Sequence, residues 1–185
     1  MLNTCNDISV VMAVWRGDSP DQIAAAIYSV LEQTVRPTEF VVVADGPVGS
    51  DIDACLAHHS ERGEITLLRL PENVGRGGAR NHAINATTGQ LVAIMDADDV
   101  CRPTRLAQQS DFIARHDIDL LGGLIAEFDQ VVGDNSSIRI VPLKHDSICR
   151  MLRRRSAFNH VTLMFRREAF DQIGGYRKLN YVEDW

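Results

Sequence analysis

The sequence predicts an α/β domain built on a doubly wound, mostly parallel sheet. Short apolar runs typical of strands alternate with segments of helical periodicity through residues 8–118, in the order βαβαβαβα. The runs are apolar at nearly every position, which indicates strands that are buried on both faces. The chain of 185 residues is about one domain in length and can bury a core without disulfides or metals.

The expected strands of this part are short apolar runs bounded by turn residues. The first run, ISVVMAVW, and the second, EFVVVA, consist almost wholly of apolar and β-branched residues. The second run ends at Asp45-Gly46-Pro47, which is a turn sequence. The four strands are expected over residues 8–15, 39–44, 65–70 and 91–95.

The helices between these strands are indicated by capping residues and by apolar side chains at helical spacing. Ser19, Pro20 and Gln22 predict the start of the first helix as its N-cap, first helical residue and capping-box partner. The apolar stripe of this helix consists of Ile23, Ile27, Val30 and Leu31. Three further helices are expected over residues 51–62, over residues 78–86 and from Pro103 onward.

After residue 118 the alternation becomes less regular, but no linker, repeat or low-complexity tract divides the chain. We therefore expect a single domain over residues 1–185, with a regular half, 1–118, and a less regular half, 119–185. The second half is expected to contain strands over residues 120–128, 137–141 and 161–165, a basic helix over 146–155 and a short helix over 167–173.

The net charge of −6 is unevenly distributed along the chain. Residues 1–138 carry 9 Lys and Arg against 20 Asp and Glu, a net charge of −11 that argues against a nucleic-acid binder. Residues 139–178 carry 10 against 3, a net charge of +7. This basic segment either faces an anionic partner, such as a phospholipid headgroup or a pyrophosphate-linked molecule, or is a solvated face.

Cysteine usage and hydropathy indicate a cytoplasmic protein. The four cysteines are scattered without a CxxC pair, which suits a reducing compartment. No apolar run approaches the length of a membrane span, and the first one lacks the flanking residues of a signal peptide.

Acidic residues follow two of the expected strands, at the edge where parallel sheets bind ligands. Asp45 follows the second strand, although Asp before Gly is also an ordinary turn pair. The cluster DADD at residues 96–99 follows the fourth strand, and its three carboxylates repel one another unless a cation lies among them. Mg²⁺ and Mn²⁺ prefer such oxygen ligands and share them with substrate phosphates. The alternative is an acidic turn before the helix at Pro103.

The segment NVGRGGARN, residues 73–81, places three glycines just before a helix. Its backbone can approach a phosphate or a ribose closely, with Arg76 or Arg80 and the helix N-terminus favouring an anion. It is not a dinucleotide fingerprint, since Arg80 stands where the third glycine belongs, and it lacks the Gly-Lys-Ser/Thr of a Walker A loop. Taken alone, the segment indicates an anion-binding turn.

Together these stretches resemble the family 2 glycosyltransferases, whose fold is the Rossmann-like type A nucleotide-sugar transferase fold (GT-A). The matching stretches are ISVVMAVWRGD, VVVADGP, ENVGRGGARNHAI, GQLVAIMDADDVCRPTRL, FNHVTLMFRREAF and GGYRKLNYVEDW, in the order and at the spacing of the family. The second strand departs from the pattern, with Ala44 and Pro47 where the family has Asp and Ser. The first strand departs with Ala13, Trp15 and Arg16 in place of Pro, Tyr and Asn.

The resemblance implies transfer of a sugar, with inversion, from a nucleotide-diphosphate donor, most often a UDP-sugar. The acceptor would be a glycan or a lipid-linked molecule in polysaccharide or cell-envelope synthesis. Asp45 is then expected at the nucleobase and Asp96 at the ribose or metal region. Asp98, in the DxD motif, is expected to bind Mn²⁺ or Mg²⁺. Arg80 would add a charge-assisted contact to a phosphate or the base.

On the acceptor side, the resemblance assigns substrate contacts to Asn159 and His160, with a buried structural histidine as the alternative. An inverting transfer also needs a carboxylate that removes the proton of the acceptor hydroxyl, away from the metal ligands. By the family match this base is Asp184, and Glu183 positions the acceptor or the loop.

The same resemblance gives each half of the domain a function and a location. Residues 1–118 would form the nucleotide-sugar-binding half and residues 119–185 the acceptor-side half. Family 2 domains usually continue through at least one more helix, so the chain is expected to be C-terminally truncated at Trp185. The expected location is cytoplasmic, with peripheral contact at the anionic inner face of the membrane.

Two other functions are compatible with the sequence. A nucleotidyltransferase also combines a parallel sheet with Mg²⁺ carboxylates, but it normally carries a glycine-rich basic loop after the first strand, which residues 15–18 (WRGD) match poorly. A non-catalytic nucleotide-sugar-binding protein or a truncated fragment would share the donor motifs. Sugar-nucleotide hydrolysis measured with and without an acceptor separates an enzyme from a binder.

Overall fold

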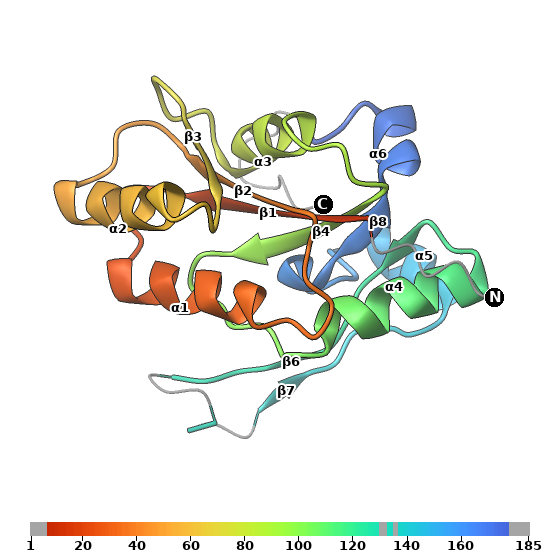
Figure 1. The fold of residues 1–185 in the computed structure, drawn as a ribbon. Coiled ribbons are helices and arrows are strands. Elements are labelled where there is room, and N and C mark those ends of the chain that lie inside the picture. Colours follow the sequence, from red (N-terminus) through yellow and green to blue (C-terminus); the bar gives the residue numbers. More distant parts are fainter. Residues whose placement is uncertain (1–6, 130–132, 135–136, 178–185) are drawn as a thin grey trace.

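A six-stranded sheet forms the centre of the protein in the computed structural model, which describes residues 7–129, 133–134 and 137–177 (Figure 1). Its strands are β1 (Ile8–Val14), β2 (Glu39–Ala44), β3 (Thr66–Arg69), β4 (Leu91–Asp96), β5 (Leu120–Leu121) and β8 (Met164–Arg166). The strand order is β3-β2-β1-β4-β8-β5. The first four of these run parallel, whereas β8 is antiparallel to β4 and to β5. The predicted mostly parallel sheet is confirmed.

Helices cover both faces of the sheet, as Figure 1 shows. They are α1 (Pro20–Leu31), α2 (Ser50–Glu61), α3 (Arg76–Asn85), α4 (Arg105–His116), α5 (His145–Leu152) and α6 (Arg167–Ile173). The helices α1, α2 and α4 pack on one face, and α3 and α6 on the other. None of the helices in the described ranges is both long and apolar enough to cross a bilayer.

Alternation along the buried strands produces the two layers of the core. Val10 and Met12 of β1 share one apolar cluster with Ile27 of α1, while Val11 between them belongs to the opposite cluster with Ala83 of α3. All five side chains are at most 1% exposed. Because both faces of each central strand are covered, the strands are apolar at nearly every position.

The predicted elements up to residue 118 are confirmed, each with ends within two residues of the expected positions. The capping box at the first helix is wrong. Ser19 is the N-cap residue, but its side chain makes no capping hydrogen bond, and only its carbonyl accepts the first helical bond, from Ile23 N at 2.9 Å. Gln22 lines a cleft instead of bonding back to the cap. Pro20 alone, with its fixed φ, accounts for the start of the helix.

The single strand predicted over residues 120–128 is also wrong, because it is broken at two glycines. β5 ends before Gly122, and β6 (Ile125–Ala126) pairs antiparallel with β7 (Ile138–Arg139) in a separate two-stranded sheet. A Cβ at Gly122 would lie 2.7 Å from Cδ1 of Phe158. The N–H of Gly123 donates to Oγ1 of Thr162 at 2.7 Å, so side chains from later in the chain replace the strand partner here.

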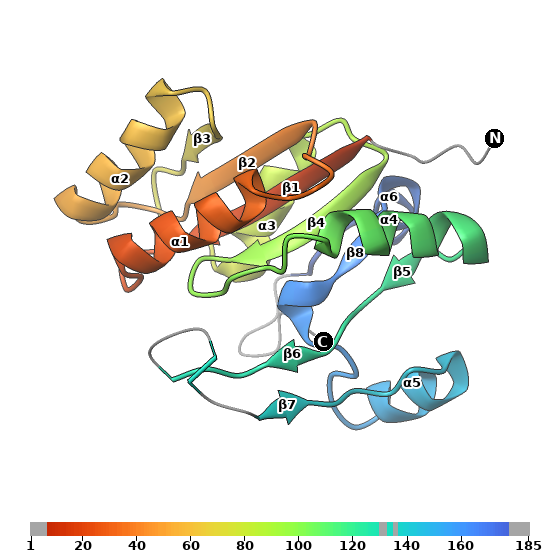
Figure 2. The same cartoon turned by 60° about the horizontal axis from the view of Figure 1, so that its bottom comes forward.

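Asn159 anchors this break. Its Nδ2 donates to the carbonyl oxygens of Gly123 at 3.0 Å and Arg139 at 3.3 Å, which ties β6 and β7 to the body of the protein. The strand predicted over residues 161–165 is shifted, because η1 (His160–Thr162) is a 3₁₀ turn and β8 begins only at Met164. Figure 2 shows that β6, β7 and α5 project from the main sheet.

Candidate active site

A cleft opens at the point where the winding direction of the sheet reverses. From β1 the chain proceeds to β2 and β3 on one side and then returns to place β4 on the other side of β1. In open α/β sheets, ligands bind at the carboxyl ends of the strands at this switch point. The loops that follow β1, β2 and β4 border a cleft of about 610 Å³, together with the start of α3. Its lining residues are Ala13, Val14, Trp15, Gly17, Asp18, Gln22, Asp45, Asn73, Gly75, Arg76, Arg80, Asp96, Ala97, Asp98 and Asp99.

Asp45 joins the end of β2 to the segment before α3. Its Oδ1 accepts the N–H of Val74 at 2.7 Å, and its Oδ2 accepts Nδ2 of Asn73 at 3.0 Å. The side chain is therefore held in one orientation, and the residue is only 6% exposed at the wall of the cleft. The predicted contact of Asp45 with a nucleobase would use the lone pairs of the same oxygens that these bonds leave free.

Gly46 permits this close approach. Its φ is +83°, and a Cβ there would lie 2.6 Å from the backbone nitrogen of Asn73. A larger residue would push the 73–75 segment away from Asp45. The turn pair Asp45-Gly46 is thus required by the packing of two backbones and not only by local turn geometry.

We expect Gly46→Ala to lower the free energy of unfolding by about 1–3 kcal/mol, since the positive φ is strained for alanine and the Cβ meets backbone atoms. Gly49→Ala is the matched control, because nothing lies within 4 Å of a Cβ at Gly49. Urea unfolding of both variants measures the difference. Equal stability of the two variants would contradict the contact at Asn73.

Two of the predicted donor residues pair with each other. Nη2 of Arg80, on α3, donates to Oδ1 of Asp96 at 2.7 Å, across the end of β4. The side chain of Arg80 is 3% exposed and that of Asp96 is 30% exposed. The ion pair holds the end of β4 against α3 and leaves part of the Asp96 carboxylate facing the cleft. Arg76, in the first turn of α3, also lines the cleft.

The rest of the cleft wall concentrates negative charge. Burial and the nearby carboxylates of Asp98 and Asp96 raise the pKa of Asp99 to about 6, against the opposing effect of Arg105 and Arg139. A carboxyl group with a raised pKa holds its proton more readily, so full ionisation of the neighbouring carboxylates in the cleft is disfavoured. A bound cation would remove this conflict.

A divalent ion in this cleft would have to share its coordination with a substrate. Among the residues that the structure describes, no group of three or more His, Cys, Asp or Glu side chains is placed to hold a metal ion. Asp98 is exposed in the cleft, next to Asp99, whereas Asp96 is engaged by Arg80. Mg²⁺ is commonly held by one or two carboxylates with substrate phosphates completing its shell, and this cleft offers that donor set.

The structure adds Asp18 to the cleft, a residue that motif reasoning did not assign. Its Oδ2 accepts the N–H of Trp15 at 2.9 Å, which closes a tight turn after β1. Burial and the charge of Asp98 raise the pKa of Asp18. The hydrogen bond from Trp15 and the charge of Arg76 act in the opposite direction but do not cancel this shift. The available signal was the position of WRGD directly after the first strand, at the same sheet edge as Asp45 and the DADD cluster.

Of the residues predicted on the acceptor side, those that the structure describes do not lie in the cleft with the predicted donor residues. Asn159 is 5% exposed and serves as the anchor of β6 and β7, and neither it nor His160 lines the cleft among the described residues. Nε2 of His160 lies 2.9 Å from the hydroxyl of Tyr176. His160 is half-buried, and both its structural alternative and the substrate contacts of the two residues stay predictions. Glu183 and Asp184 lie outside the described residues.

Comparison with solved structures identifies the fold. A mannosyltransferase from Pyrobaculum calidifontis, solved in complex with GDP-Man and Mn²⁺, superposes with a TM-score of 0.70 at 19% identity, covering 96% of this chain and 49% of that one. S. aureus TarS in complex with UDP-GlcNAc gives a TM-score of 0.67 at 22% identity, covering 92% and 48%. The fold is that of the GT-A glycosyltransferases, as predicted.

The chain belongs to glycosyl transferase family 2, whose family model matches residues 9–174. The amylovoran biosynthesis glycosyltransferase AmsE of Erwinia amylovora is 29% identical over 96% of this chain and 66% of its own length. An Escherichia coli UDP-Gal:alpha-D-GlcNAc-diphosphoundecaprenol beta-1,3-galactosyltransferase is 32% identical over 96% and 64%. The chain thus spans slightly less than two thirds of the length of these relatives.

Proposed function

We propose that this chain is the donor-binding and catalytic part of an inverting, metal-dependent glycosyltransferase of polysaccharide or cell-envelope synthesis. The observation that carries the proposal is the acidic cleft at the switch point, where Asp45 and the DADD cluster converge in a chain of family 2. Sequence positions more than fifty residues apart meet at one edge of the sheet, where a nucleotide-diphosphate sugar would bind.

Each part of the donor has a partner in this proposal. Asp45 would accept a hydrogen bond from the nucleobase, Asp96 would bind the ribose or metal region, and Asp98 would hold Mn²⁺ or Mg²⁺. When bound, the metal neutralises charge on the diphosphate leaving group. Arg80 fixes the orientation of Asp96 through their ion pair. Arg76, which lines the cleft at the start of α3, would contact a phosphate.

The transfer itself requires the loss of one proton, the formation of one bond and the breaking of another. The acceptor hydroxyl oxygen attacks the anomeric carbon as the bond to the nucleotide diphosphate breaks, and Asp184 takes the hydroxyl proton. Glu183 would position the acceptor. Residues 1–118 would bind the donor and residues 119–185 would face the acceptor, with Asn159 and His160 on that side.

A UDP-sugar donor and a lipid-linked acceptor are supported by the names of similar proteins. The E. coli relative is named for UDP-Gal and a diphosphoundecaprenol acceptor, and TarS was solved with UDP-GlcNAc, whereas the P. calidifontis structure contains GDP-Man. A lipid-linked acceptor would place the domain in the cytoplasm at the inner face of the membrane.

A thermal-shift screen against UDP-, GDP- and dTDP-sugars with Mn²⁺ tests the proposal. A donor at 100 times its Kd stabilises the folded state by about 2.7 kcal/mol, so it separates clearly from weak ligands. We expect stabilisation by a UDP-sugar that is lost when Mn²⁺ is chelated. No shift with any nucleotide sugar would refute donor binding, and a shift without transfer to any acceptor would favour the binding-protein alternative.

A further inference from the structure

The segment 138–155, which contains β7 and α5, exposes an unusual amount of apolar surface; we refer to it as the outer segment. Among the described residues, four large apolar side chains are more than 60% exposed, and three of them lie within residues 138–143. These are Ile138 at 61%, Ile140 at 76% and Leu143 at 82%. Isolated exposed apolar residues are normal on a protein surface, but three such residues within one short stretch indicate an interaction site.

The same segment is strongly cationic. It carries six Lys and Arg against one acidic residue, Asp146, a net charge of +5 in a chain whose total is −6. Five of the cations are exposed, and none of these five makes an ion pair with a carboxylate of the described residues. They are Lys144, Arg150, Arg153, Arg154 and Arg155. Arg139 is the exception, because its Nη2 lies 2.6 Å from Oε1 of Glu127.

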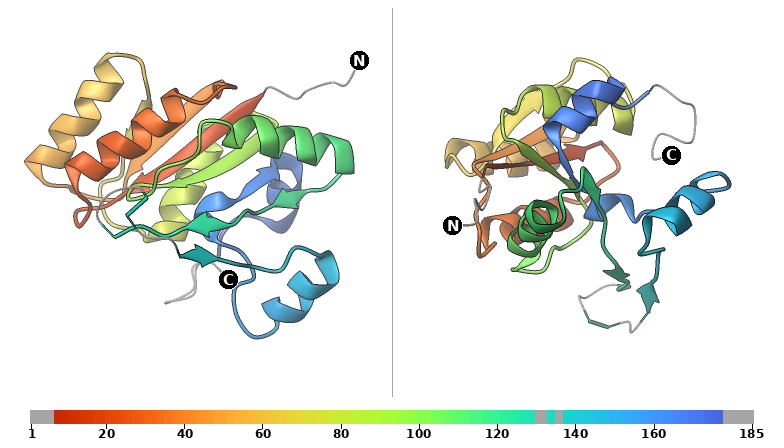
Figure 3. Two further views of the ribbon diagram at one scale, coloured as in Figure 1. Left: turned by 90° about the horizontal axis from the view of Figure 1, so that it is seen from below. Right: turned by 90° about the vertical axis from the view of Figure 1, so that its right-hand side faces the viewer.

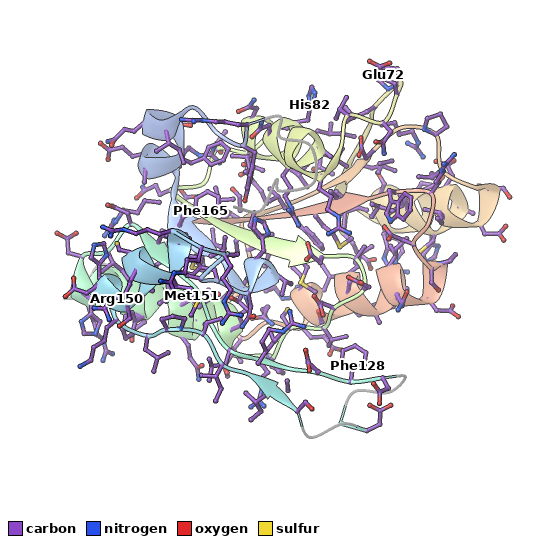
Figure 4. All side chains as sticks on the ribbon, turned by 180° about the vertical axis from the view of Figure 1, so that it is seen from behind. Glu72, His82, Phe128, Arg150, Met151 and Phe165 are labelled. Atoms are coloured by element: carbon purple, nitrogen blue, oxygen red, sulfur yellow. The ribbon has the colours of Figure 1, made fainter. Side chains whose placement is uncertain are left out.

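The outer segment also projects from the body of the protein. No residue of α5 is buried. Both views of Figure 3 show α5 standing apart from the main sheet, and Figure 4 labels Arg150, which is exposed, and Met151, which is half-buried, on this helix. The segment is held to the body at its first residues, where the carbonyl of Arg139 accepts a hydrogen bond from Asn159. A projecting element of this kind can meet an extended surface without obstruction by the rest of the domain.

We propose that the outer segment docks on an anionic lipid bilayer, with its apolar side chains among the headgroups and its arginines against lipid phosphates. Apolar side chains interleaved with Lys and Arg are typical of elements that lie in a membrane interface. An acidic bilayer surface complements both properties at once, since it accepts shallow apolar insertion and attracts cations. A purely acidic protein surface would pair with the cations but leave Ile140 and Leu143 in water.

This docking specifies which part of the chain would contact the membrane named in the proposed function. It rests on that function for the statement that the acceptor is lipid-linked. The outer segment belongs to residues 119–185, the half that the proposed function assigns to the acceptor. A bilayer contacted by residues 138–155 would therefore lie beside the acceptor side of the site. A lipid-linked acceptor could then reach the cleft without leaving the membrane.

Vesicle sedimentation tests the docking without donor or acceptor. We expect the protein to bind phosphatidylglycerol-containing vesicles, to bind pure phosphatidylcholine vesicles much less, and to dissociate as salt rises. The triple variant Arg153→Gln, Arg154→Gln, Arg155→Gln should lose about tenfold or more in affinity. The matched control, Arg62→Gln, Arg69→Gln, Arg115→Gln, removes equal charge from exposed sites elsewhere and should bind nearly as the wild type does.

The apolar contribution is tested separately. The double variant Ile140→Ser, Leu143→Ser should weaken vesicle binding several-fold, whereas Ile173→Ser, which alters a 70% exposed side chain on α6, should not. Circular dichroism confirms that each variant is folded. Equal binding to neutral and anionic vesicles would overturn the proposal. A second outcome would also overturn it. In that outcome the wild type binds no vesicles and forms a dimer, detected by light scattering, that the Ile140→Ser, Leu143→Ser variant loses.

The two proposals fail in different ways. Failure of vesicle binding with a normal UDP-sugar thermal shift would remove the docking surface and leave the donor site standing. Vesicle binding without any nucleotide-sugar shift would preserve the docking surface and remove the proposed function.

Discussion

Replacing Asp98 with asparagine is expected to abolish Mn²⁺-dependent UDP binding while leaving the fold intact. Asp98 is exposed in the cleft and supports no part of the core, so its removal should not change the free energy of unfolding in metal-free buffer. Its carboxylate is exposed at the cleft, whereas Asp96 is paired with Arg80. Isothermal titration calorimetry with UDP and Mn²⁺ measures the loss.

Asp111→Asn provides the control for this experiment. Asp111 is a carboxylate on α4 that makes a surface ion pair with Arg115 and does not line the cleft. It should keep the UDP affinity of the wild type. Unchanged affinity in Asp98→Asn would overturn the assignment of Asp98 as a metal ligand.

Replacing Asp184 with asparagine should leave donor affinity unchanged while sugar transfer falls by about 10²–10⁴-fold, the usual contribution of a general base. An amide cannot take the acceptor proton, but it preserves the size and polarity of the side chain. Calorimetry with the donor measures affinity, and a sugar-transfer assay with an acceptor measures the rate.

Glu183→Gln separates the two acidic neighbours. If Glu183 positions the acceptor, its variant should raise the acceptor KM more than it lowers kcat, whereas Asp184→Asn should act on kcat. Wild-type transfer in Asp184→Asn would place the base elsewhere. An equal loss of donor binding and transfer would instead indicate a structural role for Asp184.

The first half of the fold could be predicted because each of its elements carries its own signal. The apolar runs of β1, β2 and β4 are long enough to be recognised alone, and Pro20 marks the start of α1. The parallel direction of these strands follows because each is joined to the next by a helix that crosses back over the sheet. No information from distant residues was needed for this part.

The second half could not be predicted in the same way, because distant side chains determine its backbone. The break after β5 depends on Thr162 and Asn159, which bind the backbone of Gly123 from almost forty positions later. Local propensity favours a continuous strand over residues 120–128, and the tertiary contact overrides it.

The candidate site was predictable where a motif marked a strand end. Asp45 and the DADD cluster were found in this way, and the structure brings them into one cleft. The pairing of Arg80 with Asp96 was not predictable, because a sequence alone does not show which basic side chain contacts which acidic one. Asp18 was missed for a related reason, because its importance depends on its proximity to Asp98 across the cleft.

The way in which β8 joins the sheet has a consequence for how this enzyme family can diversify. The ladder of β8 with β4 runs along Leu91–Ala93, at the amino end of β4, while the acidic cleft residues lie at and beyond its carboxyl end. The parallel register of β1 with β4 is set between residues 8–13 and 91–96, whereas residues 119–177 attach to β4 from its other edge. Under the proposed function, sequence changes in residues 119–177 would alter the acceptor side while the strands that carry the cleft residues keep their pairing.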